Sequence, residues 1–294
     1  MIAVLGSANM DLVVAVERVP ELGETVTGAS FRTVPGGKGA NQALAAARAG
    51  GEVHLAGAVG DDEYGARIRE LLAADGVDVS GLATVAEPTG TAHITVDRSG
   101  ANSIVVVPGA NGTVRTLTDA HRGVIADAET LLLQLELPLS VVVEAAAFAQ
   151  AHGTFTVLTP APVQPLPDEL VAAVDLIVAN EREAAALPTT TAEHRDVLIT
   201  RGAAGVRYLR AGTSPLDVPP LDVPAFDVTA VDTTAAGDTF VGAFVVARGE
   251  SVDLERVLRW ASAAAALSVQ RFGASASTPR RAEIEAFVRG AAAR

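Results

Sequence analysis

The sequence has no cysteine among its 294 residues. This absence excludes disulfide bonds, thiolate catalysis, cysteine-ligated zinc and iron–sulfur clusters. It also has no excess of positive charge, because 22 Lys and Arg face 35 Asp and Glu, a formal net charge of −13 at pH 7. Nucleic acid is therefore not an expected partner. An anionic substrate would need local positive potential from helix N-termini, Lys38, an arginine or a divalent cation.

Long apolar runs and common phosphate-binding motifs are missing too. Residues 131–148 are the most apolar stretch, but four polar or proline positions interrupt it, so no membrane span is expected: Gln134, Glu136, Pro138 and Glu144. The first residues resemble a strand and carry no basic region, which argues against a secretory signal and predicts a cytoplasmic protein. Neither Gly-Lys-Ser/Thr nor Gly-x-Gly-x-x-Gly occurs, and the five histidines lack metal-binding spacing.

Aromatic residues make up only 4% of the chain, and apolar runs alternate with amphipathic ones. Strand-like segments are expected at residues 2–6, 53–58, 130–135, 154–158, 176–178 and 197–200. Helical patterns are expected at residues 39–49, 63–74, 140–151, 181–186, 254–269 and 281–293. This alternation predicts one α/β domain over residues 1–294, with a Rossmann-like, doubly wound, mostly parallel sheet and helices on both faces.

Two segments, about 12–34 and 89–107, break this rhythm and read as period-2 strands. Four such strands are too short and polar to form a core alone, so they predict a small β-sheet attached to the main domain. We interpret this sheet as a lid over the active edge, and its exposed face as the surface of a homodimer. An edge hairpin without lid function is the alternative.

The most informative motif runs from Asp232 to Phe240 and reads Asp-Thr-Thr-Ala-Ala-Gly-Asp-Thr-Phe. A strand is expected before it, over Phe226–Val231, and a helix after it. Small residues at this junction let several backbone N–H groups point at one anion: those of Ala235, Ala236 and Gly237. With Asp238 beside them as a base, the motif predicts phosphoryl transfer to a hydroxyl. Taken alone, Asp238 would be an ordinary helix cap.

A second motif, Pro35 to Gln42, precedes the first large helix. Its paired glycines permit close approach of backbone to a ligand, and Lys38 and Asn41 supply donors beside it. Alone, the segment reads equally well as a turn and a helix start.

Together these motifs make the chain similar to the ribokinase branch of the phosphofructokinase-B sugar kinase family. The resemblance covers nearly the whole length and rests on these segments: Gly6-Ser-Ala-Asn-Met-Asp11, Pro20-Glu-Leu-Gly-Glu-Thr25, Gly36-Gly-Lys-Gly-Ala-Asn41, Gly60-Asp-Asp62, Gln134-Leu-Glu136, Pro160-Ala-Pro162, Asn180-Glu-Arg-Glu183, Thr200-Arg-Gly202 and Asp232 to Phe240. It implies a kinase that uses ATP and Mg²⁺ to phosphorylate D-ribose at its 5-hydroxyl.

The resemblance also implies roles for individual residues. Sugar-binding residues would be Asn9, Asp11, Gly37, Lys38, Gly39, Asn41, Glu136 and Asp238, with Asp238 also the general base; Asn9 and Asp11 are expected at the end of the first strand. Asn180 and Glu183 would act on phosphate and Mg²⁺, and the rest of the nucleotide site would be Thr200, Arg201, Gly202, Gly205, Gly237 and Ser262. A K⁺ ion that activates the enzyme would lie among Asp232, Thr234, Ser268, Arg271, Gly273 and Ser277.

The chain departs from the family pattern at Thr159, where Asn is usual, and at Ala179, where Pro is usual. Residues 187–197 leave room for a loop or about one helical turn where the family has a full helix. These departures leave the choice of nucleotide open. The alternatives are a kinase for another furanose, a nucleoside or a keto-deoxy sugar acid, and, from a different class, a non-catalytic sugar sensor.

Overall fold

A computed structural model describes residues 1–98, 100–188, 191–213 and 219–292. Its main sheet is mostly parallel, in the order β14-β13-β12-β11-β10-β9-β1-β4-β5, with β6 also paired to β4. Near one edge, β13 is antiparallel to both of its neighbours, β12 and β14. The strands are β1 (Ile2–Leu5), β4 (Val53–Gly60), β5 (Val77–Asp78), β6 (Leu82–Val85), β9 (Thr130–Leu133), β10 (Phe155–Leu158), β11 (Leu176–Asn180), β12 (Asp196–Thr200), β13 (Val206–Leu209) and β14 (Leu221–Val223).

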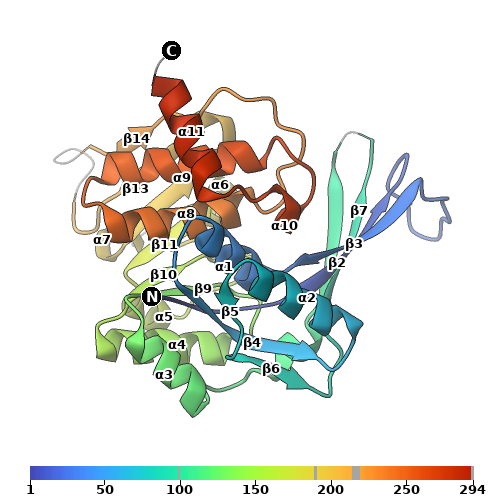
Figure 1. Cartoon of the computed structure of the whole chain (residues 1–294), viewed down its shortest axis with the longest axis horizontal. Coiled ribbons are helices and arrows are strands. Elements are labelled where there is room, and N and C mark those ends of the chain that lie inside the picture. Colours follow the sequence, from blue (N-terminus) through green and yellow to red (C-terminus); the bar gives the residue numbers. More distant parts are fainter. Residues whose placement is uncertain (99, 189–190, 214–218, 293–294) are drawn as a thin grey trace.

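Helices cover both faces of this sheet (Figure 1). They are α1 (Lys38–Arg48), α2 (Glu63–Ala74), α3 (Asp119–Asp127), α4 (Leu139–His152), α5 (Asp168–Ala173), α6 (Glu181–Ala185), α7 (Thr191–His194), α8 (Ala236–Glu250), α9 (Leu254–Ser268), α10 (Ala274–Ser277) and α11 (Arg281–Ala292). Two short 3₁₀ helices lie at Gly109–Thr113 and Gly202–Ala204.

Successive residues of each central strand enter different cores, which explains why the strands are apolar throughout. In β1, Ile2 and Val4 pack with α1, α8 and α9, whereas Ala3 and Leu5 pack with α3, α4 and α5. A parallel strand with helices on both faces needs apolar residues at every position. The predicted doubly wound fold is therefore confirmed.

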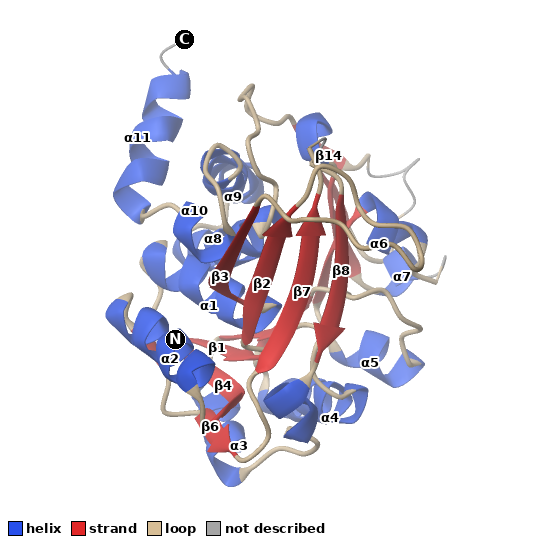
Figure 2. Ribbon diagram, turned by 90° about the vertical axis from the view of Figure 1, so that its right-hand side faces the viewer, coloured by secondary structure: helices blue, strands red, loops and turns tan. Residues whose placement is uncertain are grey.

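A separate four-stranded sheet projects from the main body, at the right of Figure 1, and Figure 2 shows it face-on. Its order is β3-β2-β7-β8, with β2 (Asn9–Ala15), β3 (Ser30–Gly36), β7 (Gly90–Val96) and β8 (Asn102–Val107). The predicted small sheet is thus present, joined to the main body through residues 6–8, 37, 86–89 and 108. Ser99, in its predicted turn, lies outside the described residues.

Some sequence predictions were wrong. Phe226–Val231 forms no strand. Instead, the backbone N–H groups of Val231 and Asp232 donate to the carbonyl of Val269 at the end of α9, which holds the segment against a helix. Asn9 and Asp11 do not end β1; they begin β2, because the chain leaves the main sheet after Leu5. Helices α3 and α5 and strands β13 and β14 were not anticipated.

The prediction that residues 187–197 leave room for only a loop or about one helical turn agrees with the structure. Helix α6 has five residues and α7 is a single turn at Thr191–His194; positions 189–190 lie outside the described residues, as does the predicted helical end at residue 293. Within the described residues, no helix is long and apolar enough to cross a membrane.

Helices α1 and α8 pack backbone to backbone. A Cβ added at Gly242 of α8 would lie 2.6 Å from both the Ala45 Cβ and the Ala46 backbone nitrogen of α1, and 2.7 Å from the Gln42 carbonyl oxygen. Only glycine permits this approach. The contact matters for function because the two helices carry the two motifs singled out above.

We expect Gly242→Ala to lower the free energy of unfolding by about 1–3 kcal/mol, because it overpacks this contact. Gly249→Ala in the same helix is the matched control, since nothing lies within 4 Å of its added Cβ. That control should be neutral or stabilising by about 0.5–1 kcal/mol, because alanine is the better helix former. Urea unfolding curves measure both variants, and equal stability of the two would contradict the packing account.

Candidate active site

The Asp238 carboxylate lies in the first turn of α8 and is 7% exposed. Two side-chain amides of α1 hold it: Asn41 Nδ2 donates to Oδ2 at 3.2 Å and Gln42 Nε2 donates to Oδ1 at 3.0 Å. The two motifs, about 200 positions apart in the sequence, thus meet at one carboxylate. Its remaining lone pairs can accept a proton or hydrogen bond from a ligand hydroxyl.

Glycines at the start of α1 bring β2 close to this carboxylate. Gly37 precedes the helix with φ 90°, and an added Cβ there would lie 2.7 Å from the Asn9 backbone nitrogen. A Cβ at Gly36 would lie 2.3 Å from Asp11 Oδ2. The predicted sugar residues of β2 therefore lie beside the N-terminus of α1 because neither glycine has a side chain.

Glu136 ties the loop after β9 to the same place. Its Oε2 accepts hydrogen bonds from the Ser7 hydroxyl at 2.5 Å, the Lys38 backbone N–H at 3.1 Å and the Asn9 amide at 3.4 Å. A carboxylate at a helix N-terminus is favoured by the helix dipole. Glu136 thus fixes Asn9 and the start of α1 relative to each other.

Three carboxylates lie near one lysine in this site, and burial shifts the pKa of two of them, Asp11 and Asp238. Burial raises the pKa of Asp11 to about 7, with further increases from Glu136 and Asp238 and an opposing effect of Lys38. Burial also raises the pKa of Asp238, although Lys38, Gln42 and Asn41 all favour its charged form. Burial alone would lower the pKa of Lys38, but the nearby carboxylates outweigh it, and the pKa is raised. Such clusters of shifted groups are typical of functional sites.

The loop before α8 has the geometry of an anion site. Ala235 has φ 57°, the one positive φ at a residue other than glycine in the described part of the chain. The Ala236 N–H donates to the Thr233 carbonyl at 3.2 Å, but among the described residues no acceptor is found for the N–H groups of Ala235, Gly237 and Asp238. A Cβ at Gly237 would meet nothing within 4 Å. Unpaired N–H groups at a helix N-terminus favour a phosphate or another anion.

Most of the predicted nucleotide residues line one adjoining cavity of about 250 Å³: Thr200, Gly202, Gly205, Gly237 and Ser262. The Ser262 hydroxyl is buried and lacks a hydrogen-bond partner among the described residues. Arg201 does not line the cavity, and its guanidinium pairs with Asp222 at 2.7 Å. The side chains of Asn180 and Glu183 bond to each other at 2.8 Å and cap α6.

The six predicted K⁺ residues lie in two segments that touch, residues 232–234 and residues 268–277. Asp232 Oδ1 accepts from the Thr234 N–H and Oδ2 from the Gly273 N–H, both at 2.9 Å. Ser268 and Ser277 end α9 and α10, and the Arg271 guanidinium pairs with Glu283. The carboxylate, hydroxyl and carbonyl oxygens of this set are donors suited to a hard cation. Within the described residues, no group of three or more His, Cys, Asp or Glu forms a metal site.

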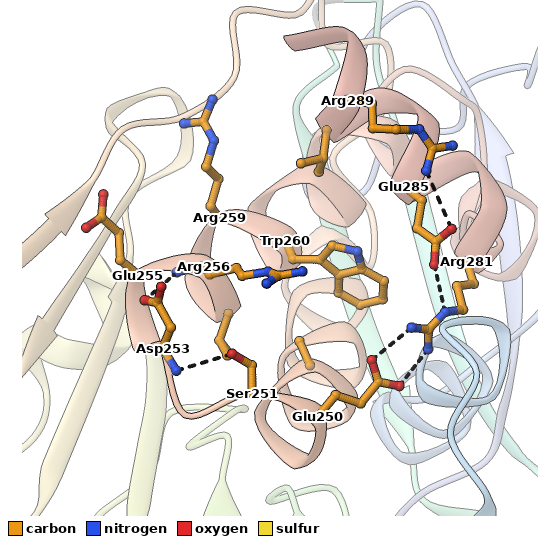
Figure 3. Close-up of a pocket in the computed structure, with 13 residues that line it drawn as sticks. Glu250, Ser251, Asp253, Glu255, Arg256, Arg259, Trp260, Arg281, Glu285 and Arg289 are labelled. Atoms are coloured by element: carbon orange, nitrogen blue, oxygen red, sulfur yellow. Dashed lines mark hydrogen bonds and ion pairs between the residues drawn. The ribbon is translucent and has the colours of Figure 1, made fainter. Parts of the chain in front are cut away.

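Another cavity, of about 580 Å³, lies between the end of α8, the start of α9 and α11 (Figure 3). Its carboxylates Glu250 and Glu285 both pair with Arg281, and Trp260 forms part of its wall. None of the predicted site residues lines it.

Sequence reasoning missed three residues that build the site. Gln42 stands inside the second motif, and Ser7 stands inside the first segment of the resemblance, but neither has a predicted role. Asn111 donates from Nδ2 to Asn9 Oδ1 at 2.7 Å and accepts from the Ala8 N–H at 3.0 Å, so it orients Asn9. Their partners lie up to 196 positions away, and no local pattern reveals such contacts.

Comparisons with known proteins agree with this geometry. The model of the pfkB family of carbohydrate kinases matches residues 1–281. The chain is 44% identical to the ribokinase of Bacillus subtilis (97% of this chain, 98% of the relative) and 40% identical to that of Haemophilus influenzae (98% of each). The structure of Arabidopsis thaliana ribokinase complexed with ribose and ATP superposes with a TM-score of 0.88, at 33% identity over 98% of each chain.

We expect the Asp11 carboxyl to titrate near pH 7 in the ligand-free protein, as measured by ¹³C NMR of labelled aspartate. Because its folded-state pKa lies above the ordinary 3.8, protonated Asp11 contributes stability that is present at low pH and is lost as the pH rises through about 7. Glu136→Gln should lower this pKa toward 3.8, whereas Glu255→Gln on the surface of α9 should leave it unchanged. A value near 4 in the wild type would contradict the account.

Proposed function

The chain belongs to the pfkB family of carbohydrate kinases, and we propose that it transfers the γ-phosphoryl group of ATP to the 5-hydroxyl of D-ribose. The products are ribose 5-phosphate and ADP. The observation that carries the proposal is the position of Asp238. A base and an anion site share the first turn of α8. The side chains predicted to bind the sugar lie on one side of this turn, and the cavity lined by the predicted nucleotide residues lies on the other.

On the sugar side, ribose hydroxyls would meet carboxylates, amides and one ammonium. Asn9 and Asp11 of β2 face the start of α1, where Lys38 and Asn41 stand, and Glu136 completes the set. These groups both accept and donate hydrogen bonds, as a polyhydroxyl ligand requires. Ionised Asp11 is the stronger acceptor, so ribose should bind more tightly above pH 7 than below it.

In the transfer step, the O5–H proton moves to Asp238 as O5 forms its bond to the γ-phosphorus, and the bond to the β-phosphate oxygen breaks to release ADP. The N–H groups at the start of α8 would stabilise the negative charge on the transferred group. Burial raises the pKa of Asp238, which makes it a better proton acceptor than an exposed carboxylate. Its contribution remains largely positional, since phosphoryl transfer has a loose transition state.

ATP would bind as its Mg²⁺ complex. The residues proposed for the ion lie at the edge of the site and do not enclose it. Asn180 and Glu183 would contact water molecules of the ion after opening their mutual hydrogen bond, and Mg²⁺ usually keeps such waters. When bound, the ion neutralises charge on the phosphates. Because ATP is a cytoplasmic cosubstrate, the proposal also places the chain in the cytoplasm.

A K⁺ ion among the six predicted residues would act through the loop and not on substrate. Asp232 already links the loop before α8 to Gly273. Burial opposes its ionisation, but hydrogen bonds from Thr234 and Gly273 favour the charged form and lower the pKa of Asp232. A cation here would fix the conformation of the loop whose N–H groups form the anion site. We propose K⁺ as an activator for this reason.

The small sheet is proposed both as a lid and as the surface of a homodimer. On the face of the small sheet turned away from the Asp232 loop, Val105 and Val107 of β8 and Phe31 of β3 are exposed apolar residues. A second copy could cover this surface. The cavity between the sheet and the loop of Asp232 contains Asp11 and Arg32, so closing the sheet would enclose the sugar site.

Among the alternatives, a nucleoside kinase would need aromatic groups around a base, and Phe31 is the one such residue in the lid segment 12–34. A non-catalytic sensor would have no need for both Asp238 and the open Gly237 loop. Ribose therefore remains the proposed substrate.

We expect Asp238→Asn to reduce kcat about 10²–10⁴-fold, the usual contribution of a general base. The asparagine keeps the shape, and its oxygen still accepts a hydrogen bond from one α1 amide, so ribose and ATP affinities measured by calorimetry should change far less than kcat. Glu255→Gln provides a remote control with normal activity. Turnover near that of the wild type in Asp238→Asn would remove Asp238 from the role of base.

A further inference from the structure

Behind the ligand-facing residues, buried side chains form a hydrogen-bonded chain that ends on Asp238. Gln134 Nε2 donates to Gln42 Oε1 at 2.7 Å, and Gln42 Nε2 donates to Asp238 Oδ1 at 3.0 Å. Gln42 Nε2 also donates to the Thr159 hydroxyl at 3.2 Å. Both glutamines are almost fully buried, with exposures of 0% and 1%. A buried amide network of this kind is costly unless its members bond to one another.

The main sheet anchors one end of this hydrogen-bonded series of side chains. Gln134 directly follows β9 and Thr159 directly follows β10, and the last residues of these strands, Leu133 and Leu158, are paired. The Thr159 N–H continues the ladder by donating to the Leu133 carbonyl at 2.9 Å. Gln134 and Thr159 therefore stand on the rigid edge of the sheet, below α1.

Gly6, which directly follows β1, makes space for this arrangement. A Cβ there would lie 2.1 Å from Gln134 Oε1 and 2.7 Å from the Gly39 Cα of α1. The end of β1 thus packs against both Gln134 and the first turn of α1 without any side chain between them.

The network determines which way the Gln42 amide faces. Its oxygen is taken by the Gln134 NH₂, so its own NH₂ faces Asp238 Oδ1. The flipped amide would place an oxygen against the carboxylate and an NH₂ against another NH₂, losing both bonds. Asn41 holds Oδ2, so each carboxylate oxygen has one fixed donor, and the carboxylate cannot rotate freely.

We propose that Gln42 is a positioning residue, oriented by Gln134 and Thr159, that fixes the Asp238 carboxylate in the direction needed for proton transfer. The inference rests on the proposed function of Asp238 as the base. Neither glutamine needs to touch substrate, because both act through Asp238 alone.

Loss of the Gln42 donor should change the pH dependence as well as the rate. The charged groups facing Asp238 are Lys38 of α1, which favours its ionised form, and Glu136 and Asp11, which disfavour it. Without Gln42, the ionised form loses a hydrogen bond worth about ten- to a hundredfold in an equilibrium constant. The pKa of Asp238 then rises by about one to two units.

The test compares kcat as a function of pH, at saturating ribose and Mg²⁺–ATP, for the wild type, Gln42→Met and Gln150→Met. Methionine preserves the length of the buried side chain but cannot donate, and Gln150 is the control because its amide is exposed on α4. For Gln42→Met we expect the acidic limb of the kcat profile to move to higher pH by about one pH unit or more. At pH values below the limb, kcat should fall at least tenfold. The KM for ribose should change by less than about threefold, and Gln150→Met should match the wild type.

Gln134→Met is the second variant, because it removes the group that orients Gln42 and leaves Gln42 in place. Gln134→Met should shift the acidic limb of the kcat profile in the same direction by a smaller amount. If Gln42→Met fails to fold, Gln134→Met provides the test. A lower kcat with an unmoved pH profile in both variants would overturn the inference and leave a merely structural role.

Failure of the proposed function gives a different result. A wild type that does not phosphorylate ribose contradicts that function directly. In that case ¹³C NMR titration of Asp238 in ligand-free wild type and Gln42→Met decides the inference, since an equal pKa in both would show that Gln42 does not act on the carboxylate.

Discussion

The burial of the Asp238 carboxylate between the N-termini of α1 and α8 is the interaction on which the rest of the site depends. A charged group there is tolerable because two amides of α1 and the ammonium of Lys38 compensate for the lost water. The helices approach closely enough for this only because Gly242 has no side chain. The same burial raises the basicity of the carboxylate, so packing and chemistry have one origin.

Electrostatics explain how a chain with a net charge of −13 can hold anionic ligands. On the side proposed to bind the sugar, three carboxylates gather around Lys38 and offer acceptors to a neutral ligand. On the side proposed to bind phosphate, the backbone N–H groups at the start of α8 supply partial positive charge without a side chain. In the proposed function the two surfaces meet at Asp238, where O5 of ribose would lose its proton and gain the phosphoryl group.

Much of this could be predicted from sequence, and the failures have a common cause. Apolar alternation located the central strands, because a parallel sheet with two covered faces leaves a strong local pattern. The motif around Asp238 was readable because its small residues and carboxylate are adjacent in the chain. Phe226–Val231 has strand composition but packs against the end of α9, and Gln42 acts through partners on three other elements. Such long-range contacts leave no trace in a local window.

The most direct test of the account measures ADP release from ATP and Mg²⁺ with D-ribose, 2-deoxyribose, adenosine, fructose 6-phosphate or 2-keto-3-deoxygluconate, in K⁺ or in tetramethylammonium. We expect fast turnover with ribose, and faster turnover in K⁺ than in tetramethylammonium. Faster turnover with another compound would leave the phosphoryl-transfer mechanism in place but change the assigned substrate. No turnover with any of them, while ribose still binds, would contradict the central claim that Asp238 and its loop form a catalytic site.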